Sequence, residues 1–249
     1  MKNLLILGCS YSHWWDGKCF GKSYPALIAQ NYPNYHVYDM SEPGGSNDTL
    51  YLRLKFLKEE FGVIPDKILI QFTHLSRTNL NLRYPVKPAR VSYETLNNYT
   101  YHLENDWPDH SLTITPSLIR PDTNSYHMKL LRRLNKITLV NINLLRMFYT
   151  WYVYSETNFW NIQKEIDLVN YAYGTQNILS FDWVGHYSPG VHSHISIPNK
   201  HLGSISYAFR KKDKFMSLGV DDAPHYGEEG QAEVYKWLSP HLEEFLNAR

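Results

Sequence analysis

Two short segments near opposite ends of the chain contain residues that could together perform acyl chemistry. Ser10 closely follows the apolar run 4–7, so a buried strand would present its hydroxyl at the carboxyl end. Asp222 precedes His225 by three residues, just before a helical pattern that begins near residue 228. An aspartate in this position can orient the imidazole ring and stabilise its cation, and the ring can accept the serine proton. The two segments predict a serine nucleophile activated by a histidine and an aspartate.

Each of these residues also has a structural interpretation. Ser10 could cap a following helix, and Asp222 could cap a local turn while His225 lies at the surface. Asp221 is an alternative carboxylate, with a spacing one residue longer. Cys9 could itself be a nucleophile, although alternation along the strand should turn it to the opposite side. The two segments taken together favour Ser10, His225 and Asp222 as a catalytic set.

The rest of the sequence predicts the elements that must position these residues. Apolar runs separated by helical patterns indicate one α/β domain spanning residues 1–249, with a parallel sheet of about five strands between helices. Strands are expected at 3–8, 35–40, 67–72, 147–154 and 178–181, and helices at 24–31, 49–61, 124–147 and 228–247. Ligands bind at the carboxyl ends of the strands in such sheets, so Ser10 should lie in a crevice. Residues 78–122 show no long period and predict an irregular insertion that covers or shapes the site.

Composition narrows the class of partner. The 249 residues have a formal net charge of +1, which gives no general attraction to nucleic acid or to an anionic membrane. Aromatic residues make up 15% of the chain, including 20 Tyr and 7 Trp, which suits sugar surfaces but also ordinary packing. The expected partner is a small-molecule or glycan ester; the oligomeric state is not predictable from these features.

The cysteines and the first residues bear on the compartment. Two cysteines, Cys9 and Cys19, are too few for a disulfide framework, and free thiols fit a reducing compartment. The apolar run at the start is about four residues, shorter than the roughly 7–15 of a secretory signal. No stretch has the length of a membrane-spanning helix. A cytoplasmic location is expected.

No cofactor or metal is expected. The segment around Ser10 lacks the glycine spacing and the lysine of a phosphate loop. The alternative is a zinc site in a histidine-rich stretch, where an H-x-H pair and a third histidine could bind the metal. The residues of this stretch are Asp182, His186, His192, His194 and His201. Histidines in a loop-rich segment are more often simply exposed.

Three motifs together resemble the SGNH (GDSL-like) hydrolase family, in its divergent phage or bacterial form. Residues 8–12 (GCSYS) resemble the block with the nucleophilic serine, residues 43–47 (PGGSN) the block with an oxyanion glycine, and residues 222–225 (DAPH) the last block. The resemblance implies a flavodoxin-like three-layer α/β/α fold with Ser10 as nucleophile. It also implies that Gly45, or its neighbour Gly44, donates a backbone N–H to the oxyanion hole.

One further block of the family follows the third strand and has the pattern Gly-x-Asn-Asp. This chain departs from that pattern. The chain reads Gln71-Phe72-Thr73-His74, so Thr73 falls at the position of the asparagine. Losing one oxyanion donor costs about 10²–10³ in rate. Asn47 or Arg77 could compensate for it, and Arg77 could also hold an anionic group of the substrate.

These observations predict an esterase or acyl hydrolase that uses Ser10, His225 and Asp222, and the aromatic content favours an acylated carbohydrate. Two alternatives stay open. Thr73 and the insertion at 78–122 would also fit a catalytically weakened binding or structural module. Transfer of the acyl group to an acceptor sugar is the other alternative, and it would be recognised by its products.

Overall fold

A computed structural model describes most of the elements predicted above. The described residues are 1–9, 12, 22–41, 46–73, 78–81, 93–102, 111–114, 147, 151–152, 156–182, 194–195 and 228–248. The main sheet contains β1 (Lys2–Leu7), β2 (Tyr35–Asp39), β3 (Lys67–Phe72), β5 (Tyr93–Leu96), β6 (Tyr99–His102), β8 (Ile178–Asp182) and β9 (His194–Ile195). The helices are α1 (Tyr24–Asn31), α2 (Leu50–Phe61), α5 (Glu156–Tyr173) and α7 (Glu228–Asn247), with 3-10 turns η2 (Asn47–Thr49) and η4 (Thr175–Asn177). A separate antiparallel pair joins β4 (Thr78–Asn81) to β7 (Ser111–Ile114).

The order of the main sheet is β5-β6-β2-β1-β3-β8-β9. Every neighbouring pair is parallel except β5 and β6. The five strands from β2 to β9 therefore follow the flavodoxin-like order 2-1-3-4-5. The predicted α/β fold is confirmed, and β6 and β5 extend the sheet beyond β2. From β1 the chain first adds β2 on one side and later adds β3 on the other side. The carboxyl ends of β1 and β3 therefore lie at the switch point where ligands bind in such sheets.

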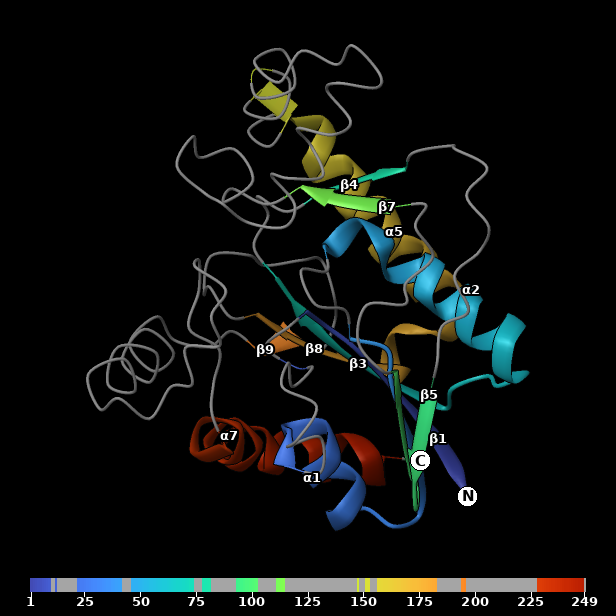
Figure 1. Ribbon diagram of the computed structural model, residues 1–249, viewed down its shortest axis with the longest axis vertical. Coiled ribbons are helices and arrows are strands. Elements are labelled where there is room, and N and C mark those ends of the chain that lie inside the picture. Colours follow the sequence, from blue (N-terminus) through green and yellow to red (C-terminus); the bar gives the residue numbers. More distant parts are fainter. Residues whose placement is uncertain are drawn as a thin grey trace.

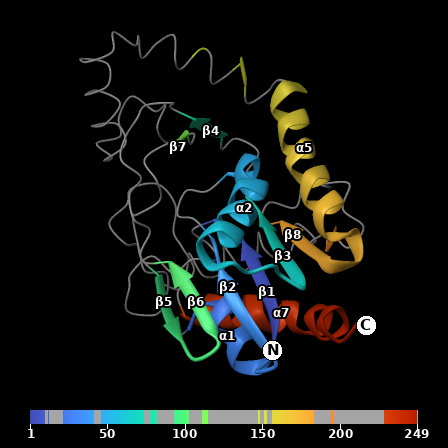
Figure 2. The same ribbon diagram turned by 90° about the vertical axis from the view of Figure 1, so that its right-hand side faces the viewer.

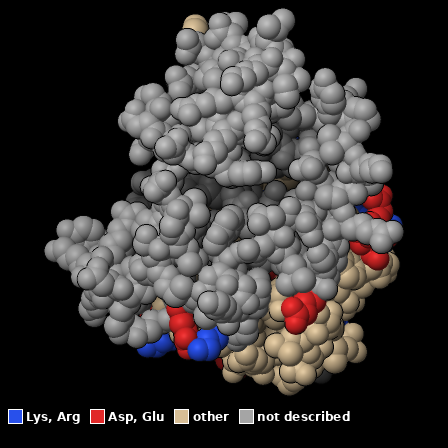
Figure 3. Space-filling model, viewed as in Figure 1, with Lys and Arg blue, Asp and Glu red and all other residues tan. Residues whose placement is uncertain are grey.

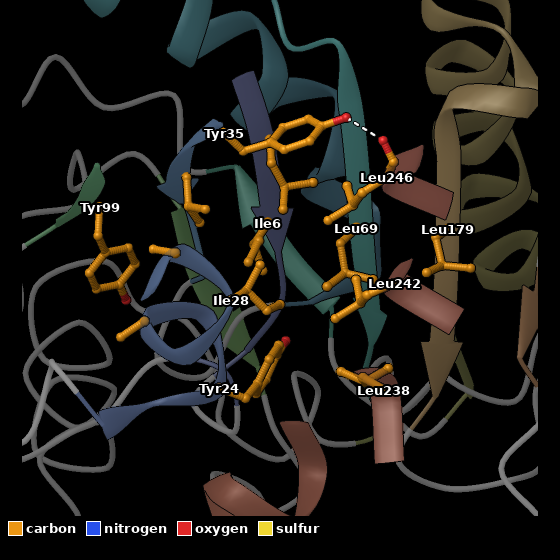
Figure 4. Close-up of a cluster of buried hydrophobic side chains, with 14 of the residues drawn as sticks. Ile6, Tyr24, Ile28, Tyr35, Leu69, Tyr99, Leu179, Leu238, Leu242 and Leu246 are labelled. Carbon is orange, nitrogen blue, oxygen red and sulfur yellow. Dashed lines mark hydrogen bonds between the residues drawn. The ribbon is translucent and has the colours of Figure 1, made fainter. Parts of the chain in front are cut away.

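Helices cover both faces of the sheet (Figure 1, Figure 2). Alternate residues of β1 show how the layers are filled: Leu4 and Ile6 belong to the core under α1 and α7, while Leu5 and Leu7 belong to the core under α2 and α5. Because both faces are buried, the strand reads as a continuous apolar run without alternation. The first of these cores is drawn in Figure 4.

Local signals fix the ends of the first two helices. The Ser23 side chain accepts a hydrogen bond from the Ala26 N–H, and Pro25 occupies the first turn of α1. Helix α2 ends at Gly62, whose φ of 64° is left-handed and whose N–H donates to the Lys58 carbonyl. These signals agree with the predicted helices at 24–31 and 49–61.

Helix α7 lies beside α1 on the same face of the sheet (Figure 2). At its beginning, the Gln231 side chain accepts a hydrogen bond of 3.0 Å from the Tyr24 N–H, and Glu228 pairs with Lys22 at 2.7 Å. At its end, the Tyr35 hydroxyl donates to the Leu246 carbonyl at 2.9 Å (Figure 4). Helix α1 leads back from the carboxyl edge of the sheet toward the start of β2. The contacts at both ends of α7 therefore place its first residues at the carboxyl edge.

Two sequence predictions differ from the structure. The strand expected at 147–154 is wrong at Met147, Trp151 and Tyr152, which are helical, and α5 was not predicted. A mixed aromatic and apolar run without a clear period does not distinguish a strand from a helix. The predicted helix 124–147 lies outside the described residues except for Met147.

Within 78–122, expected to be irregular, the described parts form β4 to β7. Strands of four residues are too short to show a period.

In the part of the chain that the structure describes, no helix has the length and apolar character needed to cross a bilayer. Figure 3 shows described acidic and basic side chains lying next to one another along the rim of one face.

Candidate active site

The described residues include two of the seven predicted site residues, Asn47 and Thr73. The other five, Ser10, Gly45, Arg77, Asp222 and His225, lie outside the described residues, and their roles stay predictions. The described residues nearest to these five in the chain follow β1, follow β2, begin β4 or begin α7: Cys9, Ser12, Ser46, Thr78 and Glu228.

Asn47 and Thr73 are joined by a reciprocal pair of hydrogen bonds. The Asn47 side-chain amide donates to the Thr73 carbonyl at 2.9 Å, and the Thr73 N–H donates to Asn47 Oδ1 at 2.9 Å. Both residues are buried, so the pair fixes the start of η2 against the carboxyl end of β3. The Thr73 hydroxyl is also buried, and among the described residues it has no hydrogen-bond partner. A buried hydroxyl in this state favours any ligand that can accept its proton.

Gln71 lies near the end of β3, on the face covered by α1 and α7, and holds the segment that follows β1. Its Oε1 accepts hydrogen bonds from the Cys9 N–H at 3.1 Å and from the Ser12 hydroxyl at 2.8 Å. The Cys9 thiol also donates to it, at 3.4 Å. Ser12 in turn lies 2.6 Å from the Tyr24 hydroxyl of α1. All four residues are buried, so this polar cluster is a fixed part of the core.

Gly8 is necessary for this close packing. A Cβ on Gly8 would lie 2.3 Å from Ser12 Oγ and 2.9 Å from Gln71 Oε1, closer than side-chain carbons approach other atoms. The glycine immediately after β1 therefore lets the backbone approach the Gln71 amide.

Arg53 of α2 is buried, with 1% of its surface exposed, and crosses beneath the carboxyl ends of β1 and β2. Its Nη1 donates to the Gly8 carbonyl at 2.6 Å and to the Met40 carbonyl at 3.4 Å. Its Nη2 donates to the Ser46 carbonyl at 3.2 Å and to the Thr49 hydroxyl at 2.9 Å. One guanidinium thus ties together the two loops that lead to the predicted Ser10 and Gly45 positions.

Asp39, the last residue of β2, is buried beside these loops. Its carboxylate accepts hydrogen bonds from the Tyr99 hydroxyl at 2.9 Å and from the Ser41 N–H at 3.0 Å. Burial raises the pKa of the Asp39 carboxyl from 3.8 to about 6, while the hydrogen bonds from Ser41 and Tyr99 and the charge of Arg53 act in the opposite direction.

We expect this carboxyl to make stability depend on pH. Its pKa is higher in the folded state, so between about pH 4 and 6 the folded chain binds a proton that the unfolded chain has released. The resulting stabilisation is complete below pH 4 and is lost as the pH rises through 6. It corresponds to about 3 kcal/mol in the free energy of unfolding. Urea unfolding at pH 4 to 8 measures it, with Asp39→Asn for comparison. Parallel pH curves for the two proteins would contradict the assignment.

Sequence reasoning missed Gln71, Arg53 and Asp39, although the first two had a signal in the sequence. Gln71 is a polar residue inside the apolar strand KILIQF. Arg53 lies three residues after Leu50 and one before Leu54, within the apolar stripe of α2. A polar residue at a core position needs buried partners, but the sequence does not say which ones.

No protein-family model and no curated protein matches the sequence. Among solved structures, an esterase, EstA from Pseudoalteromonas sp., covers 100% of this chain and 100% of its own, with 10% identity and a TM-score of 0.44. A member of the lipolytic protein G-D-S-L family from Veillonella parvula covers 100% of both chains, with 11% identity and a TM-score of 0.38. An extracellular lipase from Streptomyces rimosus covers 97% of this chain and 99% of its own, with 12% identity and a TM-score of 0.39. These similar structures are esterases and lipases, one of them of the G-D-S-L family; at these identities and TM-scores the likeness assigns no activity to this chain.

Proposed function

We propose that the protein is a serine-dependent esterase or acyl hydrolase of the SGNH type. Ser10 attacks the ester carbonyl, His225 accepts the serine proton and later returns it to the leaving alcohol, and Asp222 orients His225. Water then attacks the acyl-enzyme, with His225 again accepting and returning a proton, and releases the acid. The N–H groups of Ser10 and Gly45 stabilise the oxyanion.

The observation that supports this proposal most directly is a chain of buried contacts between the two ends of the sequence. Gln231 accepts from the Tyr24 N–H, and the Tyr24 hydroxyl contacts Ser12. Gln231 follows His225 by six residues, and Ser12 follows Ser10 by two. Described residues that follow each predicted catalytic segment in the sequence, Ser12 and Gln231, therefore both contact Tyr24 at the carboxyl edge, which supports a shared site.

The pairing of Asn47 with Thr73 supports a modified oxyanion hole. Both ends of the Asn47 amide bind the Thr73 backbone, so Asn47 acts by fixing that residue. The buried Thr73 hydroxyl supplies the additional donor to the oxyanion. Arg77, four residues further, would hold an anionic group of the substrate.

The substrate class follows from composition. We propose a small-molecule or glycan ester, with an acylated carbohydrate favoured by the 20 Tyr and 7 Trp, and a cytoplasmic location. Hydrolysis and transfer to a sugar acceptor share every step up to the acyl-enzyme, and product analysis with a competing acceptor separates them.

Covalent labelling tests the proposal without knowledge of the substrate. A fluorophosphonate probe should modify Ser10, identified by mass spectrometry of the labelled peptide, because only an activated serine hydroxyl attacks such phosphorus centres rapidly. His225→Ala should slow labelling strongly, whereas Ser239→Ala should leave it unchanged, because the Ser239 hydroxyl donates to the Lys236 carbonyl within α7. A folded protein that remains unlabelled at Ser10 would contradict the proposal. That result would favour a binding or structural module, which the threonine at position 73 also allows.

A further inference from the structure

We propose that Gln71 is a positioning residue that fixes the segment carrying Ser10, an inference that rests on the proposed function. Gln71 stands where the SGNH pattern Gly-x-Asn-Asp has a glycine, which has no side chain to bind the segment after β1. Among the described residues, the hydrogen-bond partners of the Gln71 side chain are Cys9, Ser12 and Phe72, and none of these is a predicted catalytic residue. Gln71 acts through the residues on either side of Ser10.

One oxygen atom holds both sides of that segment. Gln71 Oε1 accepts from the N–H of Cys9, one residue before Ser10, and from the hydroxyl of Ser12, two residues after it. The Ser12 N–H also donates to the Cys9 carbonyl at 2.9 Å. Cys9 and Ser12 thus bind the same acceptor atom, and Ser10 lies between these two residues in the sequence.

The orientation of the carboxamide is fixed by a separate contact. Gln71 Nε2 donates to the Phe72 carbonyl at 2.8 Å, which leaves Oε1 directed at Cys9 and Ser12. The single proton of the Ser12 hydroxyl is donated to Gln71, so the Tyr24 hydroxyl must donate to Ser12. Burial raises the pKa of the Tyr24 phenol well above its usual value, so the phenol keeps this proton. The result is a chain of two hydrogen bonds, in which Tyr24 donates to Ser12 and Ser12 donates to Gln71.

Fixing the nucleophile in this way matters for rate more than for binding. A displacement of about 1 Å of a reacting group can cost about 10²-fold. We therefore expect Gln71→Leu, which removes the shared acceptor, to lower kcat for an aryl ester 10- to 100-fold with KM nearly unchanged. The rate of fluorophosphonate labelling should fall in parallel.

Matched variants separate positioning from general loss of stability. Asn98 is a partly buried amide at the opposite edge of the sheet, where it donates to the Ala29 and Tyr35 carbonyls. Asn98→Leu should lower the melting temperature but leave kcat within twofold of the parent. Gln71→Glu keeps an acceptor oxygen in place and should recover at least several-fold of the kcat lost in Gln71→Leu. Equal kcat in Gln71→Leu and the parent, or equal loss in Gln71→Leu and Gln71→Glu, would overturn the proposal.

The Cys9 thiol provides a readout that does not depend on catalysis. Cys9 is a buried free cysteine, so in a Cys19→Ser background an aromatic disulfide reagent should modify the folded parent slowly. Gln71→Leu should accelerate the modification at least tenfold and Asn98→Leu should not. Unchanged thiol reactivity would contradict the anchoring role of Gln71, whereas absence of labelling at Ser10 in the parent would contradict only the proposed catalysis.

Discussion

Ser10→Ala is expected to lower kcat/KM for a short-chain aryl ester by about 10³-fold or more while leaving the melting temperature nearly unchanged. The loss is large because the residues of a catalytic triad act as a unit: without the hydroxyl, His225 and Asp222 have no nucleophile to activate. Oxyanion donors and substrate binding alone would support the residual rate. The measurement is steady-state hydrolysis with purified protein, accompanied by thermal unfolding of the same samples.

Ser239→Ala is the matched serine control, because its hydroxyl donates to the Lys236 carbonyl on α7 and not to the site. It should retain the parental kcat/KM. Hydrolysis by Ser10→Ala within tenfold of the parent would mean that another group carries the reaction. In that case the resemblance of residues 8–12 to the nucleophile block would reflect fold alone.

Arg53→Leu is expected to have the largest effect on stability, lowering the free energy of unfolding by about 3–5 kcal/mol. The guanidinium is the donor to three buried carbonyls, those of Gly8, Met40 and Ser46. Leucine would leave these acceptors without that donor, and each unsatisfied buried group costs about 1–3 kcal/mol. Urea unfolding at pH 7 measures the change.

Two further variants test the reason for the loss. Lys55→Leu, on the exposed side of the same helix, should change the free energy of unfolding by less than about 0.5 kcal/mol. Arg53→Lys keeps the charge but cannot reproduce the planar fork that reaches several carbonyls, so it should recover only part of the stability. Equal stability of Arg53→Leu and Lys55→Leu would show that the buried guanidinium is dispensable.

Much of the fold could be predicted because local patterns and burial agree in the first part of the chain and in its last helix. The strand at 67–72 and the helices at 24–31 and 228–247 have the bounds of β3, α1 and α7. In α7, Val234, Leu238 and Leu242 recur at helical spacing and are buried. A period of 3.6 or a continuous apolar run is a property of a few neighbouring residues, so the sequence alone is enough to reveal it.

Long-range pairings could not be predicted in the same way. Strand β6 lies beside β2, and the Asp39 carboxylate is bound by Tyr99, 60 residues later. The residues that flank the candidate nucleophile are held by Gln71, 62 residues after Cys9. Short strands and single polar residues have many equivalent partners along a chain, and only the packed sheet selects one.

The sequence by itself determined the parallel α/β architecture and placed Ser10 after its first strand, because hydrophobic period and chain order carry that information. It also named Thr73 and Asn47, but as separate donors. The tertiary structure decided that these two residues bind each other, that Gln71 and Arg53 bind residues that follow β1 and β2, and that α7 begins beside α1. These outcomes depend on which buried polar groups meet when the layers close, and the cost of leaving such groups unpaired is what fixes the arrangement.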